Sequence, residues 1–194
     1  DLPAPEPIPE SEVLKAVERA LHYFARIQEE DGSWGRETGL VILAYLSYGV
    51  THKDAKIEGS GQYVENVSKA LDWLVAQINA DGQVGSYNGY VQSIAVYVLA
   101  EALLATGDGT LKAPLQRAVT HLIQAQHEEG GWRYNFGQKG DLSVVGWAVS
   151  GLVSAKNAGV EVPEEVFRKA GGFVVACHGG EGQFGYSGGG SSLS

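Results

Sequence analysis

Residues 126–152, which read QHEEGGWRYNFGQKGDLSVVGWAVSGL, contain the unit from which the chain is built. Gln126 closes a segment with helical spacing, a Gly-Gly-Trp turn follows, and a second, apolar segment starts at Asp141. Aspartate favours this position because its side chain accepts a hydrogen bond from a free backbone N–H group in the first turn of a helix. The stretch therefore predicts two helices joined by a glycine-rich turn.

The same unit recurs along the chain with a period of about 50 residues. The bulky residue after each turn is Trp34, Val84, Trp132 or Phe184, and in every unit a glycine stands two positions before it. An acidic residue precedes that glycine in every unit. A glutamine closes the preceding helix in the first three units, as Gln28, Gln77 and Gln126, and His178 holds this place in the fourth. We therefore expect a tandem repeat of helical hairpins.

Each hairpin pairs an amphipathic helix with an almost wholly apolar one. We expect the apolar helices at residues 38–48, 91–106 and 141–157, each followed by a glycine that ends it. The amphipathic helices are expected to start near Ser11, Val64, Pro114 and Pro163. In the first of them, the helical spacing of Val13, Val17, Leu21 and Phe24 predicts a buried stripe.

The two kinds of helix select an all-α architecture. A helix that is apolar on most faces must be covered on several sides, which places it in an inner layer behind the amphipathic helices. Hairpins stacked in this way curl into an α/α toroid. Residues 11–194 supply about three and a half hairpins, so we expect only part of a ring. Residues 1–10, with proline at alternate positions, are interpreted as a stiff linker before this domain.

Composition excludes several classes of function. The 194 residues are 44% hydrophobic, which is enough for one domain with a hydrophobic core. The net charge is −9, and the sequence has no stripe of basic residues of the kind that binds nucleic acid. No strongly apolar run of membrane-spanning length is apparent, so we interpret the domain as soluble and without a transmembrane segment. Cys177 is the only cysteine, which leaves no internal disulfide and is interpreted as a core thiol.

The spacing Tyr23-Phe24-x3-Gln28-x3-Gly32-x-Trp34 resembles the Gln-Trp repeat of squalene and oxidosqualene cyclases. From about residue 11 onward the chain resembles the prenyltransferase/squalene oxidase repeat superfamily, and most of all uncharacterised bacterial repeat proteins with a Gly-Gly-Trp-Arg-Tyr signature. The resemblance implies the toroid fold and says much less about function. We interpret five repeat residues as structural, because they can join helix ends and pack on turns: Gln28, Trp34, Gln77, Gln126 and Trp132.

The sequence lacks the catalytic motifs that the resemblance to cyclases and prenyltransferases implies. The sequence has no Asp-x-Asp-Asp acid of the terpene cyclases. Asp141 and Trp147 keep the spacing of a zinc-binding motif of protein prenyltransferases, but Ser143 holds the place of its cysteine and is a poor zinc ligand. We therefore expect no catalytic residue, no metal and no cofactor, and interpret Asp141 as an N-cap.

The ends of the inner helices are the expected binding site. The candidate residues are Tyr87, Asn88, Tyr90, Trp132, Tyr134, Asp141 and Trp147. We expect a non-enzymatic module whose partner is a small molecule or a protein. One alternative is a relative of isoprenoid cyclases or transferases that acts only with further helices. Another is a toroid that binds or cleaves glycans. A homodimer is a further expectation, because an apolar flank of the last hairpin would favour association.

Overall fold

The computed structural model describes residues 10–86 and 88–187. The elements in chain order are α1 (Glu10–Arg26), α2 (Thr38–Ser47), the 3₁₀ helix η1 (Ser60–Tyr63), α3 (Val64–Ala76), α4 (Gly89–Thr106), the 3₁₀ helix η2 (Gly109–Leu111), α5 (Lys112–Gln124), α6 (Leu142–Asn157), α7 (Glu164–Ala176), β1 (His178–Gly180) and β2 (Gln183–Phe184). The nine-residue start of the expected linker, residues 1–9, lies outside the described residues, and Glu10 already belongs to α1.

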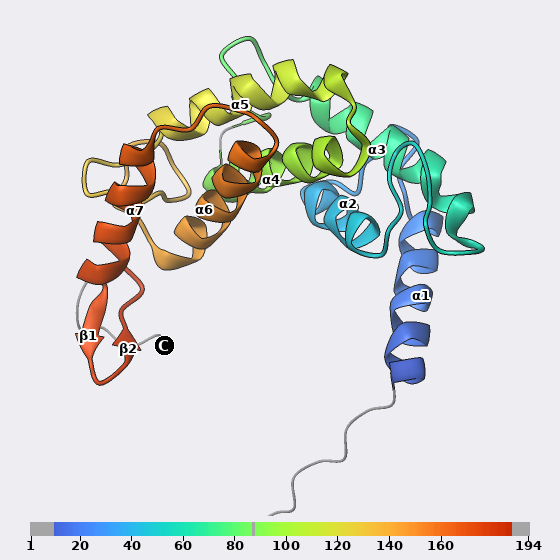
Figure 1. Ribbon diagram of the computed structural model, residues 1–194, viewed down its shortest axis with the longest axis horizontal. Coiled ribbons are helices and arrows are strands. Elements are labelled where there is room, and N and C mark those ends of the chain that lie inside the picture. The colour runs from blue at the N-terminus through green and yellow to red at the C-terminus, as the bar shows by residue number, and fades with distance from the viewer. Residues whose placement is uncertain (1–9, 87, 188–194) are drawn as a thin grey trace, which may run out of the picture.

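The helices form an open arc (Figure 1). Helices α2, α4 and α6 make its inner layer, α3 and α5 cover the outer side, and α1 and α7 stand at the two ends. The expected all-α hairpin repeat is confirmed. The departure from it is a short antiparallel hairpin of β1 and β2, in which His178 is paired with Phe184.

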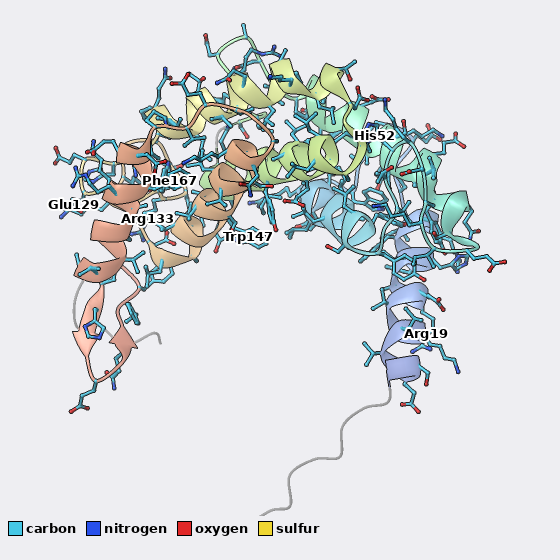
Figure 2. The ribbon with its side chains drawn as sticks, in the orientation of Figure 1. Arg19, His52, Glu129, Arg133, Trp147 and Phe167 are labelled. Carbon is cyan, nitrogen blue, oxygen red and sulfur yellow. The ribbon has the colours of Figure 1, made fainter. Side chains whose placement is uncertain are left out.

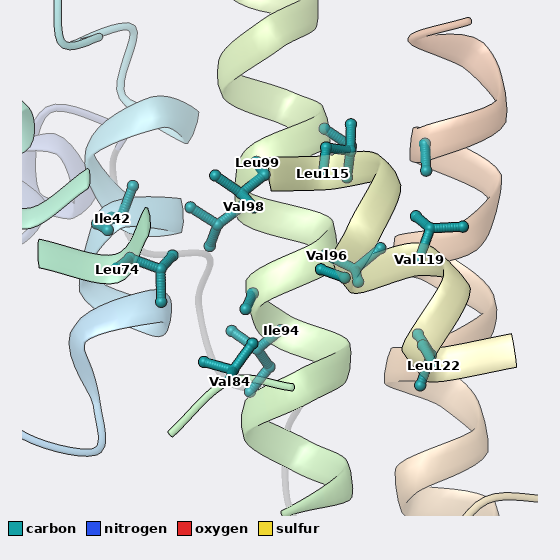
Figure 3. Packing of buried hydrophobic residues seen from close by; sticks show 14 of the residues in the cluster. Ile42, Leu74, Val84, Ile94, Val96, Val98, Leu99, Leu115, Val119 and Leu122 are labelled. Atoms are coloured by element: carbon teal, nitrogen blue, oxygen red, sulfur yellow. The ribbon is translucent and has the colours of Figure 1, made fainter. Parts of the chain in front are cut away.

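Glycine lets the inner helices approach one another closely. A methyl group on Gly151 of α6 would lie 2.8 Å from the carbonyl oxygen of Ser93 in α4. A methyl group on Gly39 of α2 would lie 2.6 Å from a methyl carbon of Ile94 in α4. Helix α4 is therefore clamped between its two neighbours, and its apolar side chains fill the core together with those of α2, α3 and α5 (Figure 3).

Capping residues determine where several of the helices begin. Asn88 accepts a hydrogen bond from the backbone N–H of Tyr90, so α4 starts at Gly89, two residues before the expected start. Asp141 caps α6 through the N–H of Val144, as the sequence predicts. Pro163 precedes the first residue of α7 instead of forming part of it. Ser11 lies inside α1 and is not its cap.

The buried stripe expected along α1 is only half present. Leu21 is buried, whereas Val13 and Val17 are 49% and 39% exposed. The physical reason is visible in Figure 1, where the N-terminal half of α1 extends past the end of α2. The N-terminal half of α1 faces only the end of α2, where Val13 and Val17 line a hollow with Ala44, Ser47 and Tyr48 and stay partly exposed.

Helix α4 is long and apolar enough to cross a membrane, by length and composition alone. In the fold, however, 56% of this 18-residue window is buried against the rest of the protein. Its apolar character is that of the central helix of a helical layer, which is covered on several sides.

Candidate functional site

The turns between paired helices are joined to the next outer helix by glutamine. The side-chain amide of Gln126 donates to the carbonyl oxygen of Gly130 in its own turn (2.9 Å) and to that of Val166 in α7 (3.0 Å). Gln28 repeats this arrangement with Gly32 (2.8 Å) and with Asn66, at the start of α3 (2.9 Å). Each glutamine therefore satisfies one carbonyl group on either side of a hairpin boundary.

The second turn uses a different glutamine. Gln92, in the first turns of α4, donates to the carbonyl oxygens of Gly82 (2.9 Å) and Ala118 (3.0 Å) and accepts from the N–H of Val84 (2.9 Å). The side chain of Gln77 makes no hydrogen bond to another described residue. Sequence reasoning missed Gln92. The signal in the sequence was an uncharged polar residue in the middle of an apolar run. In the structure Gln92 is wholly buried, and a buried polar side chain needs hydrogen-bond partners.

The two turn tryptophans are hydrogen-bonded to the helix that precedes their turn. The indole N–H of Trp132 donates to the carbonyl oxygen of Leu122 (2.7 Å), and that of Trp34 donates to Phe24 in the same way (2.8 Å). Trp132 is wholly buried. It is a core residue that a ligand does not reach, which removes it from the expected ligand-binding set and leaves its place in the repeat.

Turn glycines set the distance between hairpins. Gly32, Gly82 and Gly130 all have positive φ angles, which suit glycine. A methyl group on them would lie 2.7, 2.0 and 2.1 Å from the carbonyl oxygens of Lys69, Arg117 and Lys169, respectively. Each turn therefore rests directly on the backbone of the following outer helix.

A hydrogen-bonded chain leads inward from the third and fourth turns to Asp141. The hydroxyl groups of Tyr134 and Tyr186 lie 3.0 Å apart, and Tyr186 lies 3.0 Å from the hydroxyl of Ser143. Ser143 donates to Oδ1 of Asp141 (2.5 Å), which also accepts from the N–H of Val144. The other oxygen of this wholly buried carboxyl, Oδ2, has no hydrogen-bond partner among the described residues. The guanidinium Nε of Arg133 stands 4.0 Å from it.

The same contacts determine the acidity of Tyr186. The hydrogen bond with Ser143 lowers the pKa of its phenol. The hydrogen bond with Tyr134, burial and the negative charge of Asp141 together outweigh that effect and raise the pKa to about 12. Tyr186 therefore stays neutral at any pH near 7 and acts as a hydrogen-bonding link.

The structure brings together only some of the expected site residues. The rings of Tyr90 and Tyr134 lie 5.4 Å apart between centroids, and Tyr134 leads through Tyr186 to Asp141. Asn88 adjoins this group as the cap of α4. Trp147 projects from α6 on the inner side of the arc and is partly buried (Figure 2). Tyr87 lies outside the described residues.

An apolar cleft of about 360 Å³ opens at the starts of α2 and α4 and the end of α3. Its walls are formed by apolar side chains from α3, α4 and the second turn: Trp73, Leu74, Val84, Val91, Ile94 and Ala95. Polar side chains of Arg36, Gln77 and Asn88 also line it. Of the expected ligand-binding residues, Asn88 lies in this cleft.

At the boundaries between the second and third hairpins and between the third and fourth, a backbone hydrogen bond bridges the place that the cleft occupies at the first boundary. The carbonyl oxygen of Tyr134 accepts a hydrogen bond from the N–H of Gly89 (3.0 Å), and that of Tyr186 accepts from Leu142 (2.9 Å). Each bond holds a tyrosine against the start of an inner helix. These tyrosines stand two positions after the bulky residue of their turns, and in the second turn that position is Ser86, which lines the cleft.

Within residues 10–86 and 88–187, the structure groups no three histidine, cysteine, aspartate or glutamate side chains as a metal site would require. Cys177 is buried, and burial raises the pKa of its thiol, so it has the character of a core residue.

Comparison with known proteins agrees with the helical arrangement. The family model described as the squalene-hopene cyclase N-terminal domain matches residues 67–185, which is more than half of the chain. A probable squalene–hopene cyclase of Sinorhizobium fredii is 31% identical over 139 residues, covering 61% of this chain and 20% of that protein. A drimenyl diphosphate synthase of Streptomyces showdoensis is 32% identical over 130 residues, covering 64% of this chain and 24% of that protein.

The chain thus spans between a fifth and a quarter of the length of these two curated relatives. The matched region contains the helices from α4 to α7, most of α3, and the turns with Gln92, Gln126 and Trp132. The match therefore covers the second, third and fourth repeated turns of this chain. This chain belongs to the squalene–hopene cyclase N-terminal domain family.

Proposed function

We propose that this chain is a ligand-binding repeat domain of its family and that a small apolar molecule binds in the cleft between the first two hairpins. The observation that carries this proposal is the cleft itself. Its volume of about 360 Å³ falls within the range of roughly 300–1,000 Å³ that is usual for ligand pockets. Largely apolar walls with a few polar groups are also the usual composition of such sites.

The lining favours binding over catalysis. The described residues around the cleft include no carboxyl group, histidine or cysteine. These are the side chains that most often act as general acids, general bases or nucleophiles. We therefore assign no catalytic residue to this cleft.

Titration calorimetry with farnesol, an apolar isoprenoid alcohol, tests the proposal. We expect saturable binding with one site per chain. The variant Ser86→Tyr places a ring where the later boundaries have one, and we expect it to abolish this binding. Tyr97→Phe, a change on α4 away from the cleft lining, is the matched control and should leave binding unchanged. Farnesol binding that is absent, or equally strong in Ser86→Tyr, contradicts the proposal.

A second function is favoured by the comparisons. We propose that, within a longer protein, the domain is part of a terpene cyclase, because the matching family model and one relative are named for squalene–hopene cyclases. Incubation of this chain with squalene or farnesyl diphosphate, followed by product analysis, tests whether it acts alone. We expect no cyclised product. Cyclisation by this chain would make it an enzyme in its own right and overturn the assignment of binding without catalysis. Saturable binding of maltotetraose in place of farnesol would instead favour the glycan alternative.

A further inference from the structure

The cleft has one charged group on its lining. Of the described residues around it, only Arg36 carries a charge. Arg36 is exposed in the short segment between Trp34 and α2. Its guanidinium makes no ion pair or hydrogen bond with another described residue. The group is therefore available to a ligand that occupies the apolar part of the cleft.

Two amides can assist this cation. The side chain of Gln77, at the end of α3, makes no hydrogen bond to another described residue. Asn88 uses its side-chain oxygen to cap α4, and its NH₂ group makes no hydrogen bond to another described residue. Both side chains line the cleft together with Arg36. The polar part of the lining thus offers hydrogen-bond donors and a positive charge, whereas the walls offer apolar surface.

We propose that the ligand is an amphiphile with an apolar chain and one anionic end, a carboxylate or a phosphate, bound by Arg36. This inference rests on the proposed ligand-binding function and specifies its substrate class. A guanidinium group matches the two oxygens of either anion with two parallel N–H donors. The net charge of −9 on the whole chain does not prevent this contact, because salt screens charges beyond roughly 8 Å at physiological ionic strength.

Ligands that share one dodecyl chain and differ only in the head group test the inference. The probes are dodecanoate, dodecyl phosphate, dodecanol and dodecyltrimethylammonium, each kept below its micelle concentration. We expect the two anions to bind more tightly than the alcohol, and the cation to bind least. Comparison of dodecanoate with dodecyl phosphate distinguishes the two anionic sources. Acetate and inorganic phosphate without the chain should show no measurable binding, because the apolar walls supply most of the affinity.

Two variants separate charge from geometry. Arg36→Gln is expected to weaken dodecanoate binding about fivefold, the upper end for an exposed ion pair, and to leave dodecanol binding unchanged. Arg36→Lys should restore part of the loss, because it returns the charge without the paired donors. Arg19→Gln, on exposed α1 and outside the cleft, is the matched control and should change neither.

The outcomes distinguish this inference from the function on which it depends. If dodecanol and dodecanoate bind equally and Arg36→Gln affects neither, the cleft binds ligands but does not select anions, and only the further inference fails. If no dodecyl compound binds, or if Ser86→Tyr leaves all binding intact, the ligand-binding function fails as well.

Discussion

The boundary between the first two hairpins and the boundary between the second and third have the same plan and differ in one ring. Both have a glycine resting on the next outer helix and a glutamine that joins the turn to it. At the second boundary Tyr134 bonds to the start of α4 and lies against Tyr90, whereas the first boundary has Ser86 and an open cleft. The comparison teaches that the turns hold the hairpins together independently of whether the inner-helix ends are closed.

The largest effect is expected where a turn meets the next helix. Gly130→Ala should destabilise the protein by about 3 kcal/mol, because alanine is strained at a φ of 94° and its methyl group would lie 2.1 Å from the carbonyl oxygen of Lys169. Urea unfolding measures the change. Gly182→Ala, at a φ of 75° but with nothing within 4 Å, should cost only about 1–2 kcal/mol. Equal losses in the two variants would show that contact with the next helix contributes nothing.

Loss of a glutamine should have the next largest effect. Gln126→Ala removes the donor from two carbonyl groups at the boundary with α7, and we expect a loss of about 2 kcal/mol. Gln77→Ala should stay within about 0.5 kcal/mol, because its side chain has no such bonds. Measurement of the free energy of unfolding of the two variants tests this difference. A larger loss for Gln77→Ala would reverse our assignment of the glutamine that matters in the second turn.

Opening the second boundary should make it resemble the first. Tyr134→Ser removes the ring beside Tyr90 and the hydroxyl contact with Tyr186, at an expected cost of about 1–2 kcal/mol. It should also create a second site for farnesol, visible as a doubled stoichiometry in calorimetry. Unchanged stoichiometry would mean that the missing ring alone does not make a cleft. Tyr97→Phe again serves as the control.

The smallest effect is on the titration of Tyr186. Its pKa is raised to about 12, above the ordinary value near 10, so the folded state holds the proton more tightly than the unfolded state. The stability that this difference supplies is complete below about pH 10 and is lost as the pH rises through about 12. The difference in phenolate absorbance between the protein and Tyr186→Phe reports this titration. In Tyr134→Phe the pKa of Tyr186 should be lower, and no change would exclude the hydrogen bond as a cause.

The hairpin repeat is predictable because its signals are local. A glycine with positive φ, a bulky residue after it and a capping Asp141 act within one turn, so their spacing in the sequence is enough to place the helices. Gln92 was not predictable in the same way, because its bond to Ala118 crosses into another hairpin. Likewise, the apolar spacing of Val13 and Val17 could not reveal that α1 extends beyond its neighbour.

The candidate site was harder to predict than the fold. The sequence indicated the inner-helix starts and the turns before them, and Asn88, Tyr90, Tyr134 and Asp141 lie there. It did not indicate the cleft, because the lining residues come from α2, α3, α4 and the second turn and meet only when these elements pack together.

The nearest atom that a methyl group on Gly32, Gly82 or Gly130 would meet on the next outer helix is a main-chain carbonyl oxygen. Side-chain replacement at Lys69, Arg117 or Lys169 therefore leaves the contact in place, because the carbonyl oxygen belongs to every amino acid. The curvature of the arc is thus insulated from sequence drift on its outer surface. Changes of side-chain charge at these outer positions should therefore leave the spacing between neighbouring hairpins as it is.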